Sequence, residues 1–167
     1  DGIPQYSSSY GGKEVMPAGQ LGLRFESRPA MDAGFRVADT VTTSHDATWE
    51  QPWGERRFVR DHHHELRVDF ESTTDVARRF SLRVRVFDDG FGFRYEVPAQ
   101  PGYDSAVNIT DEVTEFRLDD ELATTAWWIP GRRWNRYEYL YNTTPLHAIQ
   151  MAHTPMTVRL PSGVHLS

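Results

Sequence analysis

The stretch WWIPGRRWNRYEYLYNTTP at residues 127–145 holds the densest group of side chains that could do chemistry. It places a single carboxylate, Glu138, in a loop with Arg132, Arg133 and Arg136. A loop carboxylate among arginines ordinarily forms a surface ion pair. The same carboxylate is also a hard oxygen ligand of the kind that Ca²⁺ binds, in sites of about six to eight oxygens. The residue types leave both interpretations open and favour the ion pair.

Aromatic rings surround this carboxylate and suit a carbohydrate ligand. A sugar presents apolar C–H faces and a rim of hydroxyls, so it fits flat rings that have polar side chains beside them. The candidate substrate-binding residues are Trp127, Trp128, Trp134 and Tyr137. The alternative is that rings such as Trp127, with Ile129, fill a core, because large aromatic side chains supply much of the apolar area that folding buries.

The segment His62-His63-His64-Glu65 offers imidazoles, which are common metal ligands. On a strand, successive side chains point to opposite faces, so His62 and His64 share one face and His63 lies on the other. A zinc site needs three or four convergent ligands, and the H-E-x-x-H spacing of a helical site is absent. We therefore expect polar histidines on a strand here, rather than a metal site.

Adjacent carboxylates at Asp88-Asp89 and at Asp119-Asp120-Glu121 resemble acid and base pairs. In glycoside hydrolysis, however, the two carboxyl groups stand roughly 5 to 9.5 Å apart and face one cleft from different elements. Neighbours in a turn do not satisfy that geometry, so turn formation is the better account of Asp88-Asp89. The chain also lacks a G-x-S-x-G elbow, a P-loop and a dinucleotide-binding glycine motif.

Composition limits the classes of function. The chain has 167 residues and a net charge of -6, which suits one domain with a core and disfavours nucleic acid as a partner. It contains no cysteine and no apolar run long enough for a membrane span. Only one of its 18 basic residues, Lys13, is a lysine, and several arginines alternate along strand-like segments. We interpret that alternation as a solvated, arginine-rich sheet face.

Alternating residues predict that strands position these groups. In RRFSLRVRVFDDGFGFRYEVP, apolar residues occupy every second position on both sides of Asp88-Asp89-Gly90. This pattern predicts a β-hairpin with an Asp-Gly turn, ended by Pro98, which cannot donate a hydrogen bond to a ladder. Upstream, residues 64–70 alternate in the same way and are expected to pair with residues 81–86.

Further strands are expected in four short segments, at residues 20–26, 34–38, 115–118 and 124–129. Near the end, residues 156–160 alternate before the turn Pro161-Ser162-Gly163, and residues 164–166 begin a return strand that stops in mid-course. Residues 7–12 are interpreted as a polar loop, and the best helix candidate is the short segment 119–125. These patterns predict an all-β, antiparallel β-sandwich that is incomplete.

Several of these motifs together resemble the N-terminal domain of glycoside hydrolase family 97, which contains α-glucosidases and α-galactosidases. The resemblance runs through nearly the whole chain in the same order. It rests on GLRFE at 22–26, on the span from Gly34-Phe35-Arg36-Val37 to Trp49-Glu50-Gln51-Pro52-Trp53-Gly54-Glu55, on RDHHHEL at 60–66, on RVRVFDDGFGFRYEVP at 83–98, and on WWIPG at 127–131 with Tyr137-Glu138-Tyr139.

The resemblance implies a two-sheet β-supersandwich like that of galactose mutarotase, with residues 1–167 forming part of this N-terminal domain. A catalytic (β/α)8 barrel and a small C-terminal β domain are expected downstream. In the α-glucosidase-like branch, glutamates hold a calcium ion at the active site, and Glu138 matches the one that the N-terminal domain supplies. The general acid and base lie on the barrel, so no catalytic residue is expected in this chain.

The implied partners are the barrel of the same polypeptide and an oligo- or disaccharide substrate, with neither nucleic acid nor membrane. We expect a periplasmic or secreted location. A different hypothesis is a free-standing carbohydrate-binding β-sandwich, whose platform would be Trp127, Trp128, Trp134 and Tyr137. A third is a purely structural interface domain, in which Trp134 and its neighbours become covered in the longer protein.

Overall fold

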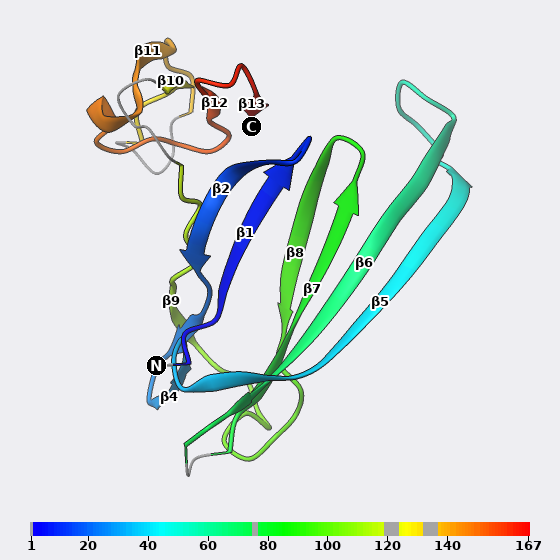
Figure 1. Ribbon diagram of the computed structural model, residues 1–167, viewed down its shortest axis with the longest axis vertical. Helices are drawn as coiled ribbons and strands as arrows, with labels where there is room; N and C mark the ends of the chain where they lie inside the picture. Colours follow the sequence, from blue (N-terminus) through cyan, green and yellow to red (C-terminus); the bar gives the residue numbers. More distant parts are fainter. Residues whose placement is uncertain (1, 75–76, 119–123, 132–136) are drawn as a thin grey trace. The chain divides into compact units, whose positions relative to one another are not determined.

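A computed structural model describes residues 2–74, 77–118, 124–131 and 137–167. The described chain is built from β-strands, with one short 3₁₀ helix, η1 (Leu146–Ala148). The strands form one two-stranded, one three-stranded and two four-stranded sheets (Figure 1). No helix in the described part is long and apolar enough to cross a membrane. The prediction of an all-β, antiparallel fold is confirmed.

The chain divides into two compact units. Unit 1 contains residues 2–4 and Gln20–Thr114, and unit 2 contains Gln5–Gly19 and Glu115–Ser167. Unit 2 is therefore assembled from two stretches of chain that are far apart in the sequence.

The largest sheet belongs to unit 1 and has the order β5-β6-β7-β8. Its strands are β5 (Phe35–Glu50), β6 (Phe58–Ser72), β7 (Arg79–Phe87) and β8 (Gly90–Glu96). The predicted hairpin is present, because β7 and β8 pair up to Phe87↔Gly90 around a turn at Asp88 and Asp89. The predicted pairing of β6 with β7 is also present, from His64↔Val86 to Glu71↔Arg79.

The alternation of apolar and charged residues divides this sheet into two faces. Phe70, Phe80 and Leu82 lie on the apolar face and are buried, and Phe80 is only 1% exposed. The Phe80 ring stacks on Phe70 at a centroid distance of 4.8 Å and meets Phe35 edge-on at 5.1 Å. Because side chains on a strand alternate in direction, the intervening arginines and carboxylates must lie on the opposite face.

The second sheet of unit 1 has the order β4-β3-β9. Its strands are β3 (Leu23–Phe25), β4 (Arg28–Met31) and β9 (Ile109–Glu112). Tyr95 on β8 connects it to the large sheet: its hydroxyl accepts a hydrogen bond from the Gly22 amide at 3.0 Å and lies 2.7 Å from the Thr114 hydroxyl. Burial raises the pKa of this phenol, which therefore stays protonated and available for both contacts.

Unit 2 holds the hairpin of β1 (Gln5–Tyr10) and β2 (Lys13–Gln20), and a sheet with the order β11-β10-β12-β13. The sheet strands are β10 (Thr125–Trp128), β11 (Asn142–Pro145), β12 (Thr157–Arg159) and β13 (His165–Leu166). Ala126, Trp128 and Val158 form its buried core, against which Leu118 and Leu146 pack. The return strand expected at residues 164–166 is β13, which pairs with β12 through Val158↔Leu166.

Three expectations differ from the structure. Residues 7–12 are not a loop, because they contain most of β1 and a two-residue turn into β2. Residues 115–118 are not in a strand. The short strand expected at residues 34–38 is the beginning of β5, which runs to Glu50. The helix considered at residues 119–125 falls mostly outside the described residues.

Candidate functional site

Glu138 lies at the apex of a very tight turn in unit 2. The Tyr139 amide donates a hydrogen bond to the Tyr137 carbonyl at 3.2 Å, which closes a three-residue turn around Glu138. The Glu138 side chain is exposed. The turn therefore presents this carboxylate to solvent at the surface of unit 2.

Neighbouring residues hold the turn from one side. The Tyr137 hydroxyl donates to the Thr154 carbonyl, and the Tyr137 ring lies 5.0 Å from that of His153. His153 is fixed in turn by its amide, which donates to the Ile129 carbonyl at 3.0 Å. These contacts link Glu138 to the end of β10. Alternation and turn signals did not single out His153 or Thr154, since neither lies in a strand.

Gly131 allows the chain to pass close to residues 151–152. Its amide donates to the Met151 carbonyl at 3.1 Å, and a Cβ at this position would lie 3.1 Å from the backbone of Ala152. The neighbouring Pro130 forms a bridge with Ala152. A larger residue than glycine would push these two segments apart, so Gly131 helps to fix where the Glu138 loop leaves the sheet.

The aromatic candidates that the structure describes have different surroundings. Trp128 is 8% exposed, lies in the core of unit 2 and donates its indole N–H to the Thr144 hydroxyl at 3.0 Å. Trp127 is half-buried on the other face of β10, where its ring stacks with that of His165 at 6.2 Å. Tyr137 is exposed, and Trp134 lies outside the described residues. The burial of Trp128 favours a structural role for that residue.

A match over the whole length of the chain shows which protein family it belongs to. Residues 1–167 match the protein family described as Glycosyl-hydrolase 97 N-terminal. The chain belongs to glycoside hydrolase family 97.

Solved structures of family 97 enzymes agree with this assignment. A family 97 enzyme from Pseudoalteromonas sp. strain K8 in complex with acarbose is 42% identical and superposes with a TM-score of 0.93. A variant of that enzyme in complex with panose gives the same values. A β-arabinopyranosidase structure, 23% identical with a TM-score of 0.80 over 94% of this chain and 26% of its own, shares the fold.

A curated relative is the probable retaining alpha-galactosidase of Streptomyces bingchenggensis (strain BCW-1), which is 31% identical over 137 residues. The match covers 82% of this chain and 20% of that protein. The Pseudoalteromonas structures match over 99% of this chain and 25% of their own. The chain therefore spans a quarter or less of the length of these family 97 proteins.

The histidine segment of this family 97 domain has the alternation that a strand imposes. His62 and His64 lie on one face with ring centroids 6.1 Å apart. His63 faces the other way, is 4% exposed, and bonds Asp61 through Nδ1 at 2.5 Å, while His45 lies 3.7 Å from the same carboxylate. Among the described residues, no group of three or more His, Cys, Asp or Glu side chains could hold a metal ion.

The arginine-rich face of the large sheet is an ion-pair network. Arg83 Nε lies 2.8 Å from Glu96, Arg85 Nε lies 2.8 Å from Glu65, and Arg94 Nη2 lies 2.6 Å from Glu96. Hydrogen bonds from Arg83 and then Arg94 lower the pKa of Glu96 to about 2. Hydrogen bonds from Arg85 and Arg83 also lower the pKa of Glu65. The arginines are partnered by carboxylates, which fits the predicted solvated face.

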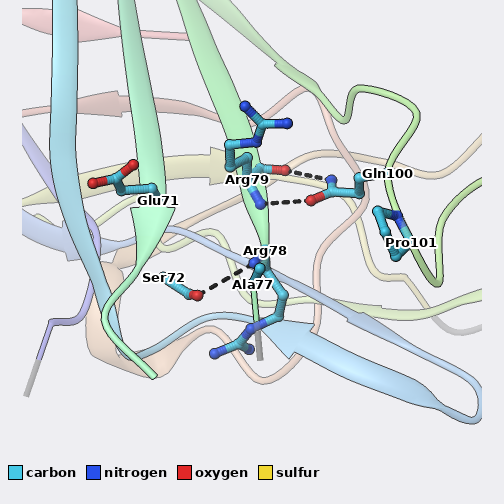
Figure 2. Close-up of a pocket in the computed structure, with 7 residues that line it drawn as sticks. All are labelled: Glu71, Ser72, Ala77, Arg78, Arg79, Gln100 and Pro101. Carbon is cyan, nitrogen blue, oxygen red and sulfur yellow. Dashed lines mark hydrogen bonds between the residues drawn. The ribbon is translucent and has the colours of Figure 1, made fainter. Parts of the chain in front are cut away.

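A small cavity of about 160 Å³ opens beside the end of this sheet (Figure 2). Figure 2 shows the Gln100 side chain bonded twice to the Arg79 backbone, donating to its carbonyl and accepting from its amide, both at 2.7 Å. The Ser72 hydroxyl accepts from the Arg78 amide at 3.2 Å. The Arg78 guanidinium binds the Ala30 carbonyl instead. These polar groups complete the sheet edge, so the cavity has a structural role.

Proposed function

We propose that the chain is the N-terminal β-sandwich domain of a glycoside hydrolase that acts on α-glucosides or α-galactosides, and that it packs on the catalytic barrel and lends Glu138 to a calcium site. Membership of family 97 supports the hydrolase assignment. Panose and acarbose complexes of a relative, and the name alpha-galactosidase of another, support the two substrate classes.

The observation that supports a metal-binding role for Glu138 is that its exposed carboxylate is held in a fixed turn. An exposed carboxylate at the apex of a tight turn is held by the contacts of Tyr137 with Thr154 and His153, so its position is set by the neighbouring segment of unit 2. An ordinary surface glutamate at the end of a long loop would lack that support. Preorganisation of this kind is what a ligand of a functional site requires.

The carboxylate of Glu138 fits a calcium site that this chain would share with another part of the protein. A carboxylate oxygen is a preferred calcium ligand, but Ca²⁺ needs about six to eight oxygens, and the described residues offer no cluster of three ligands. Glu138 would hold the ion from one side, and the resemblance to family 97 implies that further glutamate ligands lie outside this chain. When bound at such a site, the ion supplies Lewis-acid polarisation and a template for the substrate.

The residues of this chain would then act by positioning. Tyr137 and His153 fix the turn, and Glu138 presents its carboxylate to solvent at the surface of unit 2. The resemblance to family 97 implies that the general acid and base of hydrolysis, a pair of carboxyl groups that face one cleft, lie outside residues 1–167.

The test is a Glu138→Gln substitution in the full-length protein, assayed with nitrophenyl α-glucoside and α-galactoside over a range of calcium concentrations. We expect the calcium concentration for half-maximal hydrolysis to rise by at least about tenfold, because even the loss of a residue that only supports a metal ligand typically weakens metal binding by tenfold to a hundredfold. Glu14→Gln, which changes another exposed carboxylate of unit 2, is the matched control and should leave this value unchanged.

Two results would count against the proposal. If neither substrate is hydrolysed by the calcium-loaded parent protein, the assignment of substrate class is wrong. If Glu138→Gln binds calcium as the parent does, the metal-ligand role is wrong. Sugar-dependent quenching of Trp fluorescence by the isolated domain would instead favour the carbohydrate-binding module, in which Trp128, 8% exposed here, would have to become accessible to the sugar.

A further inference from the structure

The two longest strands extend past the rest of their sheet. β6 pairs with β7 only as far as His64↔Val86, whereas β5 and β6 continue to pair with each other to Glu50↔Phe58. Residues 46–62 therefore form a two-stranded ribbon with a loop at its end, here named the distal ribbon. Figure 1 shows this loop as a free turn at the end of the two longest strands of unit 1.

Side-chain contacts keep the distal ribbon ordered. Arg60 makes a two-pronged contact with Asp46 across the strands, with Nε and Nη2 at 2.8 and 2.6 Å from the carboxylate. Nearer the loop, Arg57 Nε bonds Glu50 at 2.8 Å and its guanidinium lies 5.2 Å from the Phe58 ring centre. These contacts add to the backbone pairing of β5 with β6, which continues without a break from the four-stranded sheet into the ribbon.

The end of the ribbon carries large aromatic side chains that are open to solvent. Trp53 is 83% exposed, Phe58 is 58% exposed and Trp49 is 49% exposed. Aromatic side chains, tryptophan above all, are the usual anchors of protein interfaces, and exposed groups of them mark binding surfaces. The ordered ribbon therefore ends in three potential anchors.

The arrangement of these anchors fits a protein groove better than a sugar. Trp49 is paired with Val59 and Phe58 with Glu50, so Trp49 and Phe58 are one strand position apart and point to opposite faces of the ribbon. A sugar platform needs rings that share one face. Anchors on both faces, with Trp53 in the loop between them, suit insertion of the ribbon between two protein surfaces.

We propose that the distal ribbon docks on the part of the same polypeptide that follows residue 167, the region of the catalytic barrel. The chain corresponds to only 25% of the length of the solved family 97 enzymes, so the largest part of such a polypeptide is available to cover the ribbon. The inference rests on the proposed function, because it takes the chain to be one domain of such a hydrolase. It adds the surface through which that domain would bind the rest.

Trypsin cleavage can measure how accessible the loop of the distal ribbon is, because Arg56 and Arg57 are adjacent and exposed. Limited trypsin digestion of the full-length protein is followed by mass spectrometry of the fragments that end at these residues. We expect the double variant Trp49→Ser with Trp53→Ser to be cleaved here at least tenfold faster than the parent protein. Tyr10→Ser, which changes an aromatic side chain that is 63% exposed in unit 2, is the control and should be cleaved at the parent rate.

Equal cleavage of the parent and the double variant would overturn the docking proposal. Protection of the parent that appears only when maltose is added would also overturn it and would assign the tryptophans to sugar. Circular dichroism confirms that each variant is folded. Hydrolysis of nitrophenyl glycosides is measured on the same preparations: absence of hydrolysis in the parent bears on the proposed function, and the cleavage rate bears on docking alone.

Discussion

Replacing Glu96 by Gln should remove a pH-dependent part of the stability of the large sheet. Glu96 receives two hydrogen bonds from Arg83, at 2.8 and 3.2 Å, and two from Arg94, at 2.8 and 2.6 Å. These contacts lower the pKa of Glu96 from 4.5 to about 2. Glutamine keeps the shape of the side chain but cannot carry the charge that the arginines stabilise.

The lowered pKa sets the size and the pH range of the effect. A shift from 4.5 to about 2 corresponds to at most about 3 kcal/mol of stabilisation. The Glu96 side chain is 31% exposed, and water screens such a pair, so we expect about 1 kcal/mol. Because the folded-state pKa is the lower one, this contribution is complete above pH 4.5 and disappears as the pH falls toward 2.

The assay is urea unfolding of the parent protein and the Glu96→Gln variant at several pH values from neutrality to about pH 2. We expect the parent to be more stable by about 1 kcal/mol near neutrality, and this difference to shrink below pH 4.5 until the two proteins unfold alike. A difference that stays constant down to pH 2 would show that glutamine disturbs packing, and the electrostatic reasoning would be wrong.

Further predictions concern buried residues of the two units and the close packing of Gly22 against Asp32, and each is measured by urea unfolding. Phe80→Ala should cost about 3–5 kcal/mol because Phe80 is 1% exposed, while Phe116→Ala, at a ring that is 64% exposed, should cost clearly less. Trp128→Phe should cost about 1 kcal/mol or more through the lost hydrogen bond of its indole, and retention of full stability would contradict the buried contact. Gly22→Ala should destabilise unit 1 because its Cβ would lie 2.7 Å from Asp32 Cα, and an unchanged midpoint would show that the backbone relaxes there.

The strands that the sequence predicted best are those with one buried face. In β7 the apolar residues alternate with charged ones, and Phe80 and Leu82 are buried on the same face as Phe70 of the neighbouring strand. β8 keeps the alternation, although none of its residues is fully buried. The distal half of β5 was missed because residues 39–50 are exposed throughout, so no hydrophobic period marks them. Its conformation is imposed by pairing with β6, a long-range effect that local pattern does not report.

The candidate site also had features that the sequence could predict and features that depend on the folded structure. The residue type and neighbourhood of Glu138 could be read from the chain, but its presentation depends on a turn and on Tyr137, His153 and Thr154, which meet only in the folded unit. Composition also could not separate Trp127 from Trp128. Their different surroundings follow from the two faces of β10, one of which is the core of unit 2.

Unit 2 is built from two stretches of chain that are far apart in the sequence, and this constrains the order in which the two units can fold. The Tyr6 hydroxyl binds the Glu115 carbonyl, a contact across 109 positions, and Arg117 binds the Ala18 carbonyl across 99. Closing such long loops is slow, because their entropy is lost before the contacts form. During synthesis the β1–β2 hairpin must therefore wait until all of unit 1 has emerged, and unit 2 is completed after the unit that is inserted into it.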